Sequence, residues 1–118
     1  MNTPHSPVSA ADEELELAAM RAVAESPAAS QRNLALKLGI SLGKTNFLLR
    51  ALLEKGLVKS ENFRRSDNKL AYLYLLTPSG VRTKARMTRD YLQRKELEYA
   101  ALQEEIARLR TEVDDEPD

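Results

Sequence analysis

The pattern of apolar and polar positions predicts three short helices in the first half of the chain. Each predicted helix begins after a serine that suits a helix N-cap, at Ser9, Ser30 and Ser41. Apolar residues then recur three or four positions apart, as they do on the buried face of a helix. Gly39 and Gly56 end the second and third helices, because the residue just past a helix often needs a positive φ.

The third predicted helix, from about Leu42 to Lys55, separates its residues onto two faces. The inward positions are Thr45, Leu48, Leu49 and Leu52, which follow the spacing of one buried helix face. The opposite face carries Lys44, Asn46, Phe47, Arg50 and Ala51. We expect the first face to pack in the core and the second to be left for a partner.

A hairpin follows the three helices. Segment 57–63 alternates loosely and 71–76 is rich in Leu and Tyr, while the polar stretch 64–69 contains a Ser-Asp-Asn turn signal. Helix, helix, short turn, helix and a basic-tipped hairpin form the order of a winged helix-turn-helix. The expected fold is therefore mainly α with a small β-hairpin. It comprises a disordered leader at 1–8 and a winged helix-turn-helix domain at 9–77.

The rest of the chain predicts one long helix over 78–113, with Thr77 as its cap, Pro78 at its first position and a disordered acidic tail at 114–118. A helix of about 35 residues is on the order of 50 Å long. Its second half carries a heptad of apolar residues: Leu92, Tyr99, Leu102, Ile106, Leu109 and Val113. Lys95 interrupts one layer. The pattern predicts a coiled-coil homodimer in which Glu105 would face Arg110 of a parallel partner, although it leaves the strand direction open.

Composition excludes several classes of function. The 118 residues include no Cys and a single His, His5 in the leader, which argues against a thiolate or histidine metal site, a catalytic relay and a disulfide. We expect no cofactor and no enzyme activity, because no acidic pair is placed to converge. The sequence has neither a membrane-spanning apolar run nor a signal-peptide pattern, so we expect a cytoplasmic protein without membrane contact.

The net charge of zero conceals a strong segregation of charge along the chain. Residues 1–26 carry a net −4, residues 27–95 a net +11 and residues 96–118 a net −7. A basic middle that coincides with a helix-turn-helix indicates a nucleic-acid partner.

Double-stranded DNA is the partner that this fold predicts. The second helix of the motif enters the major groove by its N-terminal end, where Asn reads adenine and Arg or Lys reads guanine. The expected contacts from this helix are Ser41, Gly43, Lys44, Asn46, Phe47 and Arg50. From the hairpin tip we expect Arg64, Arg65, Asn68 and Lys69 to contribute. Gln31 and Arg32, at the start of the preceding helix, are expected to reach phosphate.

Four short segments resemble the MarR-type transcription regulators. They are LALKLGIS at 34–41, EKGLV at 54–58, DNK at 67–69 and LTPSG at 76–80, within a resemblance that covers roughly residues 12–85. The wing sequence and the short length are most similar to the exopolysaccharide-associated subgroup. The resemblance implies dimeric, sequence-specific DNA binding by a bacterial regulator, with polysaccharide genes as candidate targets. Phe47 and Asn68 stand where the family usually has polar or basic residues and Arg, respectively.

Several alternatives stay open at this point. Phe47 contacts a thymine methyl or packs on a neighbouring element, and we favour packing. Tyr72 and Tyr74 share a strand face, and we expect core or interface packing for both. The heptad either pairs with a second copy, as we expect, or packs on the first helix. A second function class is a protein-interaction module that docks another chain. The operator, the sign of regulation and any small-molecule effector are not determined by the sequence.

Overall fold

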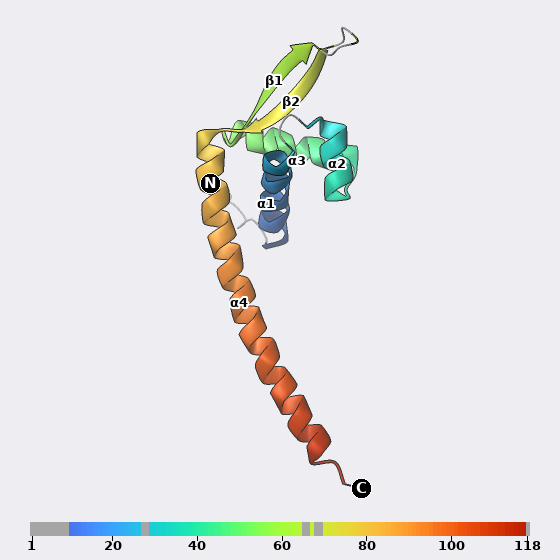
Figure 1. The fold of residues 1–118 in the computed structure, drawn as a ribbon, viewed down its shortest axis with the longest axis vertical. Helices are drawn as coiled ribbons and strands as arrows, with labels where there is room; N and C mark the ends of the chain where they lie inside the picture. The colour runs from blue at the N-terminus through green and yellow to red at the C-terminus, as the bar shows by residue number, and fades with distance from the viewer. Residues whose placement is uncertain (1–9, 27–28, 65–66, 68–69, 118) are drawn as a thin grey trace, which may run out of the picture. The chain divides into compact units, whose positions relative to one another are not determined.

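A computed structural model describes residues 10–26, 29–64, 67 and 70–117 (Figure 1). The elements are the helices α1 (Ala10–Glu25), α2 (Gln31–Leu38), α3 (Leu42–Glu54) and α4 (Pro78–Asp114), and the strands β1 (Val58–Arg64) and β2 (Leu70–Leu76). This order confirms the predicted mainly helical winged helix-turn-helix with a long C-terminal helix. The predicted leader, 1–8, lies outside the described residues.

The chain divides into two compact units, residues 1–87 and 88–118, and α4 is one helix that passes through the division. The predicted domain limit was the start of this helix. The first turns of α4 belong to the first unit because Met87 packs against its core. The helix extends one residue further than expected, through Asp114. Within the described ranges, no helix combines the length and apolar character that crossing a membrane requires.

Serine caps and a glycine turn shape the two helices of the helix-turn-helix. The Ser30 hydroxyl accepts from the Asn33 N–H at 3.2 Å, and the Ser41 hydroxyl accepts from the Lys44 N–H at 3.1 Å. Gly39 ends α2 with a φ of +69°, a backbone conformation that side chains with a Cβ rarely adopt. Its N–H donates to the carbonyl of Ala35 at 2.9 Å. The chain therefore reverses within three residues and starts α3.

The core consists of two apolar clusters, and α3 contributes to both. Leu52 lies in the first with Met20, and Leu49 lies in the second with Val23 and Leu34. Thr45 is fully buried, and its hydroxyl donates to the Ser41 carbonyl at 2.9 Å, which satisfies the polar atom inside the core. The four inward positions predicted for the third helix are buried.

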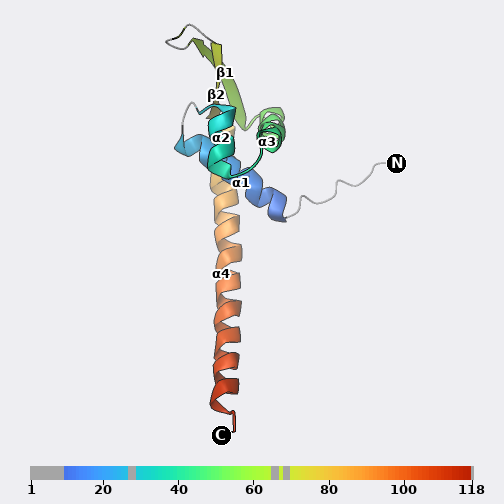
Figure 2. The same ribbon diagram turned by 90° about the vertical axis from the view of Figure 1, so that its right-hand side faces the viewer.

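The hairpin pairs β1 and β2 antiparallel, with Val58 opposite Leu76 and Arg64 opposite Leu70. The strands are shifted by a residue from the predicted limits at their loop ends. In the two views of the first unit, the loop ends of the strands project away from α1, α2 and α3 (Figures 1 and 2). Such a hairpin is the wing of a winged helix-turn-helix.

The two tyrosines of β2 have different surroundings. Tyr74 packs against both core clusters, and its burial, reinforced by the nearby Tyr72, raises the pKa of its phenol. Tyr72 is 61% exposed, so it does not pack in the core, and of the two alternatives predicted for it only packing at an interface stays a prediction. Strand residues two apart do share a face, but the helices cover only the part of that face nearest the core.

A close backbone contact joins the wing to α4. The Thr77 N–H donates to the Leu57 carbonyl at 3.0 Å, and the Thr77 hydroxyl accepts from the Gly80 N–H at 2.9 Å and donates to the Gly56 carbonyl at 2.6 Å. Gly80 is buried against this loop, and a Cβ there would collide with the Leu57 carbonyl oxygen. The absence of a side chain at Gly80 is therefore a condition for starting α4 here.

Substituting Gly80 by alanine should destabilise the first unit. Backbone must move to relieve the collision, and overpacking of this kind costs about 1–3 kcal/mol. Thermal unfolding followed by circular dichroism should show a clearly lower midpoint for Gly80→Ala. Gly43→Ala is the matched control, because a Cβ at Gly43 would meet no atom within 4 Å and Ala favours a helix. Equal midpoints for Gly80→Ala and the wild type would contradict the contact described.

Candidate nucleic-acid interface

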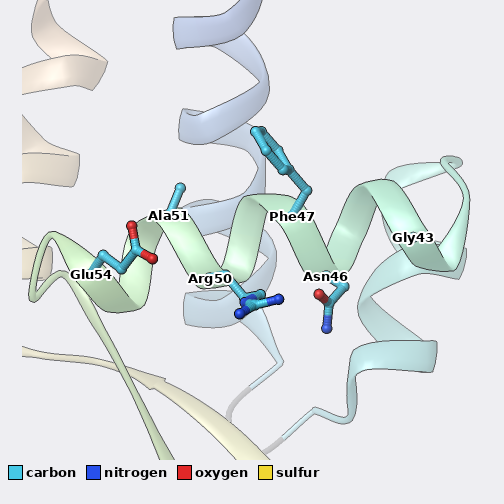
Figure 3. Close-up of a pocket in the computed structure, with 6 residues that line it drawn as sticks. All are labelled: Gly43, Asn46, Phe47, Arg50, Ala51 and Glu54. Atoms are coloured by element: carbon cyan, nitrogen blue, oxygen red, sulfur yellow. The ribbon is translucent and has the colours of Figure 1, made fainter.

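The outer face of α3 is an open, shallow surface, here called the α3 groove. It is lined by Gly43, Asn46, Phe47, Arg50, Ala51 and Glu54. Asn46 and Arg50 point to one side of the helix, and Phe47 and Ala51 point to the other (Figure 3). The groove is therefore half polar and half apolar. Both halves are positioned by the burial of Leu48, Leu49 and Leu52 on the inner side.

The Asn46 side chain is held by α2. Its Nδ2 donates to the Gln31 Oε1 at 3.0 Å, and the Gln31 Nε2 donates to the Leu42 carbonyl at 3.4 Å. Two side chains thus connect the start of α2 to the start of α3 and fix the plane of the Asn46 amide. We expected Gln31 to reach phosphate, whereas its amide is used inside the domain. The pairing spans 15 positions in the sequence, so no local pattern identifies it.

This arrangement leaves Asn46 able to read a base. An asparagine amide has two N–H donors and one acceptor oxygen, and bidentate recognition of adenine uses one donor and the oxygen. Gln31 occupies one donor. The remaining donor and Oδ1 match the requirement, and the bond to Gln31 lowers the entropic cost of ordering the amide on a base edge.

Both helices of the helix-turn-helix carry exposed cationic side chains. Lys44 and Arg50 on α3 and Arg32 on α2 are exposed. Ser41 is exposed as well, but its hydroxyl is used to cap α3. Gly43 has open space where a side chain would stand, so another molecule is free to approach the backbone there.

Glu54 is a groove residue that the sequence interpretation missed. It lies four positions after Arg50 and one turn from Ala51, and it is exposed at the C-terminal end of the α3 groove. The helical spacing from Arg50 was a signal for it. A carboxylate at that end repels phosphate and leaves the N-terminal part of α3 as the part suited to a polyanion.

Phe47 is not packed in the domain. Its side chain is 73% exposed, so the packing that we favoured for it is wrong. It points away from the core because α3 already fills that side with three leucines. Leu36 on α2 is exposed to 77% and was not singled out from the sequence. An exposed aromatic ring beside polar groups is costly for a free surface and suits a contact with a partner.

The wing residues are described only in part. Arg64 is the last residue of β1, while Arg65, Asn68 and Lys69 lie outside the described residues. Nearer the start of β1, Lys59 and Glu61 form an ion pair at 3.2 Å between Nζ and Oε1. The roles predicted for Arg64, Arg65, Asn68 and Lys69 remain predictions.

A family model described as winged helix-turn-helix DNA-binding matches residues 12–59. This segment contains α2, the turn and α3, together with most of α1. No curated protein sequence matches the chain.

Solved structures of regulators share the fold at low sequence identity. A PadR-like transcriptional regulator from Bacillus cereus has a TM-score of 0.69 at 17% identity, covering 75% of this chain and 91% of its own. The PcaV transcriptional regulator from Streptomyces coelicolor has a TM-score of 0.63 at 17% identity, covering 92% and 81%. The multiple antibiotic-resistance repressor (MarR) from Listeria monocytogenes has a TM-score of 0.56 at 22% identity, covering 85% and 70%.

The fold of the chain is therefore a winged helix-turn-helix, which it shares with solved structures of PadR-like and MarR transcriptional regulators. The proteins named in these matches are regulators and not enzymes.

Proposed function

We propose that this chain is a sequence-specific, double-stranded-DNA-binding transcription regulator that acts as a homodimer in the bacterial cytoplasm. The observation that carries the proposal is the outer face of α3, where Asn46 and Arg50 lie on one side of an open groove and Phe47 on the other. The buried inner face holds this surface in place.

Affinity and sequence choice come from different residues in this proposal. Arg32 and Lys44 neutralise phosphates, and the wing residues Arg64, Arg65, Asn68 and Lys69 add to this effect. Gly43 admits the sugar-phosphate backbone close to the start of α3. Asn46, Phe47 and Arg50 face the base edges, where they read adenine, the thymine methyl and guanine, respectively.

The second half of α4 supplies the dimer interface. The heptad side chains of Leu92, Tyr99, Leu102, Ile106, Leu109 and Val113 are between 39% and 68% exposed. A continuous stripe of large apolar side chains in water is unfavourable, and pairing with a second copy removes it from water. Two linked DNA-binding domains then engage a two-fold operator.

The MarR assignment and the gene targets rest on the sequence resemblance. The similarity to MarR and PadR-like structures, at low sequence identity, supports the proposal only through the shared fold. Exopolysaccharide genes are the proposed targets because of the resemblance of the wing sequence and the short length to that subgroup. Selection of bound duplexes from a random pool tests this, because the enriched motif both locates target genes and reveals the two-fold symmetry of a dimer.

Docking of another protein is the competing function. Exposed Phe47 and Leu36 are the observations in its favour. The polar and cationic groups around Phe47 favour DNA, since protein-docking surfaces are depleted in charge at their centre. Stoichiometric capture of one protein together with failure to enrich any duplex would favour the docking function.

Lys44→Ala and Arg50→Ala should each weaken binding to a selected operator duplex. Loss of a phosphate contact at Lys44 should lower affinity about equally for all sequences and reduce the salt slope by about one. Loss of a base contact at Arg50 should cost about 1–3 kcal/mol and relax specificity at one base pair. Fluorescence anisotropy across a salt series measures both effects. Arg108→Ala, which removes one charge from the second half of α4, should bind like wild type, and equal losses in all three variants would argue against the assigned roles.

Phe47→Ala should weaken binding to operators that place a thymine methyl against the ring. Replacing that thymine by uracil removes the methyl group and should cost the wild-type protein about 0.5–1 kcal/mol. The same replacement should cost Phe47→Ala nothing, because the contact is already lost. Anisotropy titrations of the four combinations measure the coupling. An unchanged cost of uracil in Phe47→Ala would show that the ring does not touch the methyl group.

Ile106→Asp should convert the dimer into a monomer, because pairing would bury a charge in the coil without a partner. The neighbouring Ala107→Asp introduces the same charge outside the heptad stripe and should leave the dimer intact. Sedimentation equilibrium at micromolar concentration distinguishes the two. The monomer should bind a full operator about 100-fold more weakly or worse, since the second domain no longer binds from the same molecule. A wild-type protein that sediments as a monomer would refute the dimer.

A further inference from the structure

We propose that the second half of α4 pairs with a second copy of itself in parallel and in register, from Leu92 to Val113. The proposal rests on the homodimer proposed above and adds the direction of pairing, which the apolar stripe by itself does not determine. The charges that flank the stripe decide it.

The apolar stripe has one acidic edge and one edge of mixed charge. Leu92, Tyr99, Ile106 and Val113 occupy one core position of the heptad, and Leu102 and Leu109 the other. The edge before the first core position carries Glu98, Glu105 and Glu112. The edge after the second carries Glu96, Gln103 and Arg110. Arg110 lines the same apolar hollow as Ile106, Leu109, Val113 and Asp114, so this residue lies beside the proposed seam.

Parallel pairing puts the first edge of one helix against the second edge of its partner, five residues further along. Glu105 then faces Arg110 of the second copy, and Glu98 faces Gln103. By symmetry the attractive pair forms twice, and neither of these positions brings two like charges together. Flanking charges of this kind set partner choice and orientation in coiled coils.

Antiparallel pairing sets like edges against each other. With Ile106 opposite Leu102 of the second copy, Glu105 faces its own counterpart and Glu98 faces Glu112. Because three successive heptads carry Glu on that edge, shifting the register by one heptad still pairs glutamates. In the antiparallel arrangement, Glu96 would attract Arg110 of the second copy. This attraction does not offset the repulsion between glutamates, because the contacts between glutamates are more numerous.

Lys95 marks the N-terminal limit of the strong pairing between the two helices. In register it faces its counterpart, and its ammonium is already engaged by Glu98 at 3.1 Å and lies 5.2 Å from the centre of the Tyr91 ring. Towards the first unit, Lys84 of one copy would face Arg89 of the other, and the core positions hold only Ala85 and Thr88. The two helices therefore pair most strongly from Tyr99 to Val113, and they separate on the N-terminal side of Leu92. Parallel pairing leaves both DNA-binding domains at the same end of the coil.

A charge swap tests the direction. Glu105→Arg should raise the dimer dissociation constant by about five- to twentyfold at low salt, because each of two attractive pairs becomes repulsive. Arg110→Glu should do the same. The double variant Glu105→Arg/Arg110→Glu restores the parallel pair in reverse and should return to within about threefold of wild type. In an antiparallel coil the double variant would stay as weak as Arg110→Glu, because position 96 would still face a like charge.

Cross-linking gives an independent readout in a chain that has no native cysteine. Val113→Cys should form an intermolecular disulfide under mild oxidation, since parallel pairing places the two thiols face to face. Ala107→Cys, on the outer side of the helix, is the control and should not cross-link. A wild-type monomer in sedimentation would overturn the proposed dimer itself. A stable dimer without rescue by the swap and without the Val113→Cys disulfide would overturn the parallel direction and leave the dimer standing.

Discussion

Burial of the inner face of α3 is the interaction on which the rest of the molecule depends. Leu52 and Leu49 reach into different core clusters, so one short helix holds α1 and α2 around itself. A helix buried on one side exposes the other, and this geometry carries Asn46 and Arg50 outward. The same constraint leaves Phe47 without a place in the core. The proposed DNA surface is thus a consequence of how α3 packs.

Polar side chains of the first unit divide between structural and exposed roles. Ser30, Ser41 and Thr77 cap helices. The side-chain amide of Gln31 forms hydrogen bonds with the Asn46 side chain and the Leu42 carbonyl. These groups set the relative positions of α2, α3 and the start of α4. Lys44 and Arg50 have exposed side chains on the surface that results. A contact surface of this kind is ordered before a partner arrives, which reduces the entropic cost of binding.

The segregation of charge along the chain matches the two proposed tasks. The net +11 of residues 27–95 covers the helix-turn-helix, the wing and the first turns of α4, whereas the net −7 of residues 96–118 covers most of the proposed coil. In the proposed dimer, DNA would repel the acidic coil within the screening length of roughly 8–10 Å. Zero net charge is therefore compatible with binding a polyanion.

Local signals in the sequence determined the elements of this protein. Serine caps, the glycines after α2 and α3 and the helical spacing of leucines act between near neighbours, so they predicted the helices, the hairpin, the buried face of α3 and the exposed heptad. Contacts between distant positions were decided only by the tertiary structure. Gln31 meets Asn46, the Leu57 carbonyl occupies the space of a Gly80 side chain, and the core covers Tyr74 but leaves Tyr72 and Phe47 exposed. These outcomes depend on how packed elements fill the space around each residue, and no spacing along the chain encodes that.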